Sequence, residues 1–273
     1  MSRRPGWWLN ILAKGFPLAQ FALKSMKGKY IGRIARLFLV PFLSGKNFNI
    51  TYLPINEEVS TSHSLLSENV VQELVRRSAH RVIIHRCTCR DGNKCQNYPI
   101  TLGCLLLGEG TMEIDSRVGK HATVDEALNH VNRCIRAGLL PFVGRFRPDN
   151  LLWGVRNRGK LLTICFCCRC CCIILNTAKY FPEISVNSLV KLRGLEIITD
   201  ESKCNLCDLC TKECFVNALK IENGTILYDS DRCKGCGRCI SVCPQNAIEL
   251  KIEDTDSAID ELMNRINSII DIS

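Results

Sequence analysis

Apolar residues recur at helical spacing in four parts of the chain. Helices are therefore predicted over residues 30–40, 67–78, 124–137 and 256–273. Ser67 can cap the second helix, and Thr123 opens the third with a capping box that Glu126 completes. Gly138 ends that third helix. In the first helix, apolar side chains gather on one side and cations on another, which predicts an amphipathic basic helix.

Shorter apolar runs predict strands that lead into cysteines. The segment Arg81–His85 is a predicted strand that carries the chain to Cys87. Leu151–Val155 and Leu161–Phe166 are predicted to pair as a hairpin around Asn157-Arg158-Gly159, and the second strand continues into a cysteine run. Helices and strands in this arrangement predict an α+β fold.

Composition narrows the possible chemistry. Of the 273 residues, 46% are hydrophobic, which is enough to bury a core and excludes disorder as the main state. Nineteen are cysteines, yet secreted disulfide scaffolds are usually short and follow a signal peptide that this sequence lacks. Ser2-Arg3-Arg4 resembles the start of a twin-arginine export signal, but Pro5 and Lys14 interrupt the segment behind it. Metal or iron–sulfur ligation in a reducing cytoplasm is therefore expected.

The whole net charge of +9 lies in the first 56 residues. This segment holds nine Lys or Arg and no acid, whereas the remaining 27 basic residues equal the 27 acidic ones. No apolar run in it reaches the about 18 residues of a membrane-spanning helix. A basic amphipathic arm suits docking through residues 1–46 on an anionic membrane surface or on a redox partner protein. Alternatively, its apolar face packs on its own domain; nucleic acid is not expected, because no binding module accompanies the charge.

An internal repeat carries the strongest motif. Shifting the sequence by about 29 residues superimposes residues 197–221 on 226–250, and each copy has the spacing C-x2-C-x2-C-x3-C. The two quartets are Cys204, Cys207, Cys210 and Cys214, and Cys233, Cys236, Cys239 and Cys243. Three thiolates two residues apart on a tight loop can hold three corners of a cubane, while the fourth faces away toward a second cluster.

Residues 195–252 resemble the bacterial ferredoxins that carry two 4Fe–4S clusters. The resemblance implies that cluster I uses Cys204, Cys207, Cys210 and Cys243, and that cluster II uses Cys233, Cys236, Cys239 and Cys214. Phe215 stands where the family usually has Pro, and Asn205 and Asp208 stand where Gly is frequent. Asp208 adds negative charge near cluster I and could lower its potential. Zinc is a poor alternative here, because zinc ligands come as separated C-x-x-C pairs.

Ten further cysteines indicate additional metal binding in the preceding domain. They are Cys87, Cys89, Cys95 and Cys104, then Cys165, Cys167, Cys168, Cys170, Cys171 and Cys172. Unbound, so many thiols would be an oxidation hazard. The most economical scheme is a 4Fe–4S cluster held by most of the first four with one or more from the run; a second cluster is possible, and zinc is the alternative. Cys134, His85 and His121 are interpreted as core residues rather than ligands.

This half loosely resembles uncharacterised prokaryotic 4Fe–4S proteins in which a CxCR element precedes a cysteine-rich run and a ferredoxin module. The predicted organisation is an arm (1–56), a cysteine-rich α+β domain (57–190), a βαβ-repeat ferredoxin-like domain (195–252) and a C-terminal helix. The expected function is a polyferredoxin-like carrier or electron-transfer subunit that relays single electrons at low potential.

Two alternatives to the carrier remain open. One is a redox enzyme subunit whose N-terminal cluster is a substrate site, and the other is a ferredoxin fused to a structural zinc domain. No flavin or nucleotide fingerprint is present, so the sequence leaves enzymatic activity undecided.

Overall fold

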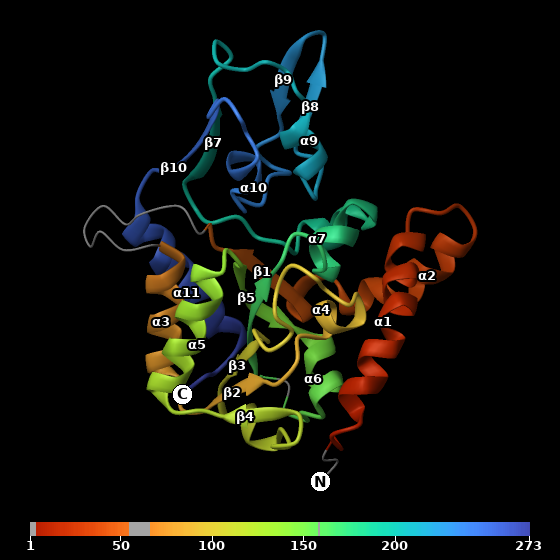
Figure 1. Cartoon of the computed structure of the whole chain (residues 1–273), viewed down its shortest axis with the longest axis vertical. Coiled ribbons are helices and arrows are strands. Elements are labelled where there is room, and N and C mark those ends of the chain that lie inside the picture. Colours follow the sequence, from red (N-terminus) through yellow and green to blue (C-terminus); the bar gives the residue numbers. More distant parts are fainter. Residues whose placement is uncertain (1–3, 55–65, 158) are drawn as a thin grey trace.

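A six-stranded antiparallel sheet forms the centre of the N-terminal part in the computed structural model, which describes residues 4–54, 66–157 and 159–273 (Figure 1). In spatial order its strands are β1 (Phe48–Tyr52), β5 (Leu140–Phe146), β6 (Leu162–Cys167), β3 (Leu105–Leu107), β2 (Arg81–Ile84) and β4 (Gly119–His121). Every neighbouring pair is antiparallel. Together with the surrounding helices, this sheet confirms that the chain mixes α and β structure.

Alternation along the strands gives the sheet two different faces. Leu162, Ile164 and Phe166 of β6 pack into a core with three helices, α3 (Leu66–Arg77), α5 (Val124–Arg136) and α11 (Thr255–Ile269). Cys165 and Cys167, on the same strand, point to the opposite face. That face is covered by α1 (Trp8–Ser25), α6 (Arg147–Trp153) and α7 (Ile173–Thr177) (Figure 1). The thiols of β6 therefore lie under the N-terminal helices.

The predicted arm is partly built into this domain. Its helices are α1 and α2 (Ile31–Leu39), followed by the short turns η1 (Val40–Phe42) and η2 (Gly45–Asn47). β1 then pairs with β5, so residues 48–52 belong to the sheet. The expected boundary at 56/57 lies outside the described residues. Across residues 4–54, 66–157 and 159–273, no helix combines the length and apolarity needed to span a bilayer.

Most predicted elements are present, with two corrections. Residues 151–155 do not form a hairpin strand, because α6 occupies Arg147–Trp153 and β6 pairs with β5 and β3 instead. Pro148 in the first turn and the left-handed Gly154 at the end favour a short helix there. Ser67 lies inside α3 rather than capping it, whereas the Thr123 capping box of α5 is confirmed. Arg158, at the predicted turn, lies outside the described residues.

Each copy of the repeat forms a strand, a short helix and a second strand. The first copy contributes β7 (Leu195–Thr199), α9 (Leu209–Glu213) and β8 (Leu219–Glu222), and the second contributes β9 (Thr225–Tyr228), α10 (Arg238–Ser241) and β10 (Ile248–Ile252). β7 pairs with β10 and β8 with β9. The remaining short elements are α4 (Thr88–Gly92), η3 (Glu109–Glu113), η4 (Ala178–Tyr180) and α8 (Glu183–Val186).

The repeat packs directly on the N-terminal domain. The rings of Tyr52 and Phe215 meet edge to face with centroids 5.3 Å apart, and Glu213 of α9 pairs with Arg169 at 2.5 Å. After the repeat the chain returns, and α11 packs on the first sheet, where Arg265 donates to Thr51 at 2.6 Å. The C-terminal helix is thus part of the N-terminal core.

Candidate metal centres

The two cysteine loops of the repeat have the same local backbone. Leu206 and Asp208 in the first copy adopt left-handed conformations, and Gly235 and Gly237 do so at the equivalent positions of the second. Such conformations let the loop curl around its own sulfurs, and they cost a non-glycine residue about 1–2 kcal/mol. The first loop therefore holds two strained residues where the second uses glycine. Asn205, singled out from the sequence, is not among the residues with positive φ.

Backbone N–H groups point at sulfur in both copies. Leu206 donates to the Cys204 sulfur and Gly235 to the Cys233 sulfur, each at 3.4 Å. Four residues after the last cysteine of each copy, Ala218 donates to Cys214 at 3.1 Å and Ala247 donates to Cys243 at 3.2 Å. N–H donors favour the charged form of a sulfur, so these cysteines suit bound thiolates. The donor set fits iron–sulfur ligation at both quartets.

Cysteines from different copies come together. A cavity is lined by Cys204, Cys207 and Cys210 of the first copy together with Cys243 of the second. On the other side, the pKa of Cys236 is raised to about 12, mainly by burial and to a smaller extent by the nearby charges of Cys214 and Cys233. A thiol with so high a pKa in the apo chain needs a metal to become a thiolate. The four cysteines of the cavity are the ones that the resemblance assigns to cluster I.

Six N-terminal cysteines, three of them buried and three half-buried, form a second cluster, which we call the inner thiol group. Its members are Cys87, Cys89, Cys104, Cys165, Cys167 and Cys172. The sulfurs of Cys104 and Cys165 are 2.7 Å apart, and those of Cys167 and Cys172 are 3.1 Å apart. The pairing of β3 with β6, which sets Leu105 opposite Ile164, brings the first of these pairs together.

Two members of the inner thiol group precede short helices. Cys87 is the N-cap of α4, and Cys172 is the N-cap of α7. A hydrogen bond from Cys89, together with the nearby Arg90 cation and backbone N–H groups, lowers the pKa of Cys87 to about 6 against the effect of burial. Backbone N–H groups at the starts of α4 and α7 therefore lower the pKa of Cys87 and Cys172, which favours their thiolate forms.

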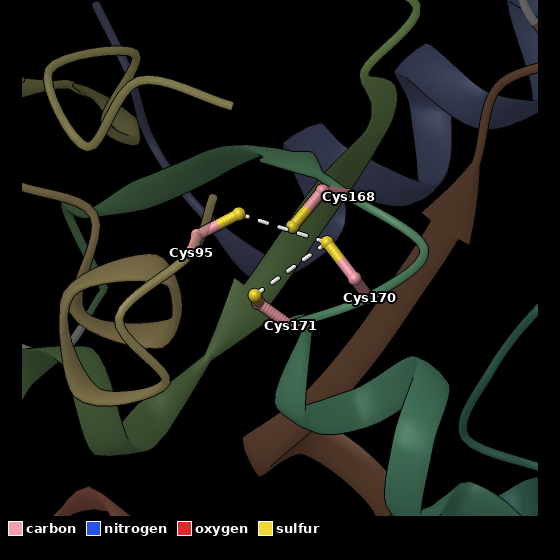
Figure 2. A group of neighbouring side chains, drawn as sticks. All are labelled: Cys95, Cys168, Cys170 and Cys171. Atoms are coloured by element: carbon pink, nitrogen blue, oxygen red, sulfur yellow. Dashed lines mark hydrogen bonds between the residues drawn. The ribbon is translucent and has the colours of Figure 1, made fainter. Parts of the chain in front are cut away.

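Four of the remaining cysteines of this half form a separate outer thiol group, Cys95, Cys168, Cys170 and Cys171. Their sulfurs all lie within 4.8 Å of one another (Figure 2). Cys95 comes from the loop after α4, and the rest come from the turn between β6 and α7. The structure thus places Cys95 apart from Cys87, Cys89 and Cys104, with which the economical scheme had grouped it.

Arg90, which sequence reasoning did not single out, lies between the two thiol groups. Its side chain is fully buried and donates to the carbonyl oxygens of Phe166, at 3.0 Å, and Leu102. Burial alone would lower its pKa, but the Cys87 and Cys168 thiolates raise it. A buried cation is stabilised by a counter-charge, which thiolates at Cys87 and Cys168 would supply. The signal in the sequence was the arginine of the CxCR element.

Of the three residues interpreted as core, Cys134 is buried, whereas His85 and His121 are exposed and the core interpretation of these two is wrong. Cys134 is buried, and burial raises its pKa to about 12, so its thiol stays protonated. The imidazoles of His85 and His121 donate to the carbonyl oxygens of Ser116 and Ile114, at 2.9 and 3.0 Å. These contacts use one ring nitrogen of each histidine for the fold rather than for a metal.

A large apolar cavity opens beside the inner thiol group. It has a volume of about 1060 Å³ and lies between the sheet and helices α1 and α6. Phe16, Leu23 and Phe142 contribute to its apolar wall, and all six inner thiols line it. Asp149 is a buried acid in the wall, and burial raises its pKa to about 7 although Thr163 donates to it at 2.6 Å. The cavity combines an apolar lining with a few polar groups, as ligand sites do.

Comparison with known proteins supports iron–sulfur binding in the second copy of the repeat. Residues 226–249 match the family model of the 4Fe–4S binding domain, Fer4. No curated protein matches the chain. The chain therefore carries a 4Fe–4S binding domain and a cysteine-rich region, and the domain indicates an iron–sulfur electron-transfer role.

Proposed function

We propose that the chain is an iron–sulfur electron carrier or electron-transfer subunit with two 4Fe–4S clusters in its repeat and a further centre at the inner thiol group. One observation carries the proposal: thiols of the two copies line a common cavity, and N–H donors face sulfur at matching positions in both copies. Bound 4Fe–4S clusters supply one-electron redox chemistry at low potential. The protein holds their ligands in place and shields them from water.

Tyr52 supports a connection between the repeat and the inner thiol group. It is fully buried, and its pKa is raised by burial and then by the charges of Cys172, Cys167 and Cys236. The first two of these sulfurs belong to the inner thiol group and the third to the second quartet. Because this one side chain is close to both sets of sulfurs, the two proposed centres would lie on either side of it. This geometry suits electron transfer between them.

Replacing single ligands tests the crossed assignment. Cys207→Ser and Cys236→Ser should each remove one cluster, so iron per chain should fall by about four atoms. Iron and sulfide are measured on anaerobically purified protein, with an EPR spectrum after reduction. Cys134→Ser, outside every proposed site, is the matched control and should keep all its iron. Unchanged iron in both ligand variants would contradict the assignment.

The N-terminal helices support a proposed membrane partner. On α2, the apolar side chains Ile31, Ile34 and Leu37 are each more than 60% exposed, so they do not pack on their own domain. Exposed cations, including Lys27, lie on the same segment. Apolar and basic groups together suit the surface of an anionic bilayer better than an acidic protein patch.

A second candidate function is a redox enzyme subunit that acts on an apolar molecule. The apolar cavity favours it, because the six thiols of the inner group line a space large enough for a small hydrophobic compound. Residues of α1 and Leu39 of α2 line this cavity, so it lies beside the helices that we propose face the membrane. In this candidate the repeat would deliver electrons to a substrate held in the cavity.

A further inference from the structure

The outer thiol group differs from the other cysteine clusters in its spacing. Within the described part of the chain, it is the one set of three or more metal-binding side chains whose ligand atoms all lie within 4.8 Å. In neither quartet of the repeat do three or more cysteine sulfurs all lie within this distance of one another. The Cys95 and Cys170 sulfurs are 3.6 Å apart, and those of Cys170 and Cys171 are 3.5 Å apart (Figure 2).

These separations fit one metal ion rather than a cubane. Four thiolates around a tetrahedral zinc ion, each at about 2.3 Å, lie about 3.8 Å from one another. In a 4Fe–4S cluster each thiolate binds a different iron, so the sulfurs stand further apart, around the outside of the cube. The outer thiol group has the smaller spacing, and its four ligands come from two tight turns.

A buried cation lies near the outer thiol group. The Arg90 side chain is fully buried and donates to the carbonyl oxygen of Phe166, two residues before Cys168. Four thiolates and one divalent ion leave a net charge of −2, which the Arg90 cation partly offsets.

The turn that carries three of the ligands also contacts the repeat. Arg169, between Cys168 and Cys170, pairs with Glu213 at 2.5 Å, and Glu213 also pairs with Arg238 at 2.5 Å. Glu213 directly precedes Cys214 of the repeat. Asn93, from the loop that leads to Cys95, donates to the Cys171 carbonyl oxygen at 3.1 Å. Fixing the turn would therefore fix the contact between the two halves of the molecule.

We propose that Cys95, Cys168, Cys170 and Cys171 bind a single structural zinc ion, which holds the 168–171 turn where Arg169 meets Glu213. The zinc site does not depend on the proposed electron-transfer role, because it uses none of the cysteines assigned to the clusters. The two proposals therefore fail separately: loss of zinc tests one, and loss of iron tests the other.

Metal analysis of purified full-length variants tests the site. The wild-type chain should hold about one zinc, and Cys170→Ser should lower zinc at least tenfold while iron stays unchanged. Cys207→Ser is the matched control, because it should lower iron and leave zinc in place. A wild-type chain without zinc, or a Cys170→Ser variant that loses iron instead, would overturn the proposal.

A measurement on the unaltered protein guards against misfolding of the variant. X-ray absorption at the zinc edge of the wild-type chain should show four sulfur ligands at about 2.3 Å. Nitrogen or oxygen ligands, or fewer than four sulfurs, would overturn the assignment. For the role of the ion, Cys170→Ser and Arg169→Ala should both speed amide hydrogen exchange in Leu209–Glu213 several-fold. Unchanged exchange in both would refute the link to the repeat.

Discussion

Tyr52 shows how one side chain can connect distant parts of the protein. Its ring is held edge to face by Phe142 and Phe215, with centroids 5.7 and 5.3 Å away. Its hydroxyl is buried and has no hydrogen-bond partner among the described residues. An unpaired buried hydroxyl costs about 1–3 kcal/mol, so a partner contributed by a bound centre would remove that cost. The sulfurs whose charges raise the pKa of Tyr52 belong to the inner thiol group and to Cys236.

Tyr52→Phe should therefore lower a reduction potential without removing a cluster. A hydroxyl that donates to cluster sulfur stabilises the reduced, more negative state, so its loss favours the oxidised form. A differential stabilisation of about 1.4 kcal/mol corresponds to about 60 mV for one electron. Redox titration followed by EPR measures the shift, and iron content should equal that of the wild type. A potential unchanged within error would show that the hydroxyl donates to neither centre.

At the scale of elements, α2 is unusual because its apolar side is uncovered. Ile34 is 63% exposed and Leu37 is 71% exposed, although both lie on the apolar stripe of the helix. An isolated apolar stripe in water has no stabilising partner, whereas a bilayer interface would cover it. Arg36 is held differently from its neighbouring cations, because it donates to the Met26 carbonyl oxygen within the arm.

Reversing the exposed charges of this segment should release the protein from anionic vesicles. Each cation near such a surface contributes about 1 kcal/mol, so Lys27→Glu, Lys29→Glu and Arg33→Glu together should weaken binding about 100-fold. Arg36 is left unchanged because of its structural hydrogen bond. Sedimentation with vesicles of phosphatidylglycerol and phosphatidylcholine measures the binding.

The control for this experiment reverses three exposed cations of the repeat region, Arg193, Lys220 and Lys251. The control variant should bind vesicles like the wild type. Binding that resists both added salt and the charge reversals at Lys27, Lys29 and Arg33 would contradict the membrane proposal.

At the scale of the whole molecule, three separate structures meet at one cavity. The arm supplies α1, the sheet supplies its thiol-bearing face, and the turn before α7 supplies Cys172. Gly92 allows α1 to approach, because a Cβ at this position would lie 2.4 Å from that of Phe16. The inner thiol group is thus covered by apolar side chains on one side and by the repeat on the other.

Filling the cavity should separate the two candidate functions. Ala22→Trp places a large ring in the cavity, so oxidation of the reduced protein by an apolar naphthoquinone should slow at least tenfold if the cavity takes substrate. Leu18→Trp, at an exposed position of the same helix outside the lining, is the control. Stopped-flow absorbance follows both rates, and hexacyanoferrate serves as a polar acceptor. Equal slowing or none with both acceptors would favour the simple carrier.

Local features of the chain were predictable because their causes are local. The capping box at Thr123, the strand before Cys87 and the helix Thr255–Ile269 follow from residues within one or two turns. The two cysteine quartets were predictable for the same reason, because three of the four cysteines in each lie within seven residues of the sequence. The strand predicted over Leu151–Val155 was wrong, because an apolar run of that length is compatible with both a strand and a helix. Pro148 and Gly154 favour the helix that the structure has there.

The sequence by itself therefore determined the repeat, the match to a 4Fe–4S binding domain and the basic amphipathic arm. Only the tertiary structure decided how the ten N-terminal thiols divide into an inner group and an outer one. The reason is physical: Cys104 and Cys165 are 61 residues apart and meet only through the register of β3 against β6. The turn after β6 then sends Cys168, Cys170 and Cys171 toward Cys95, and returns Cys172 to the inner thiol group.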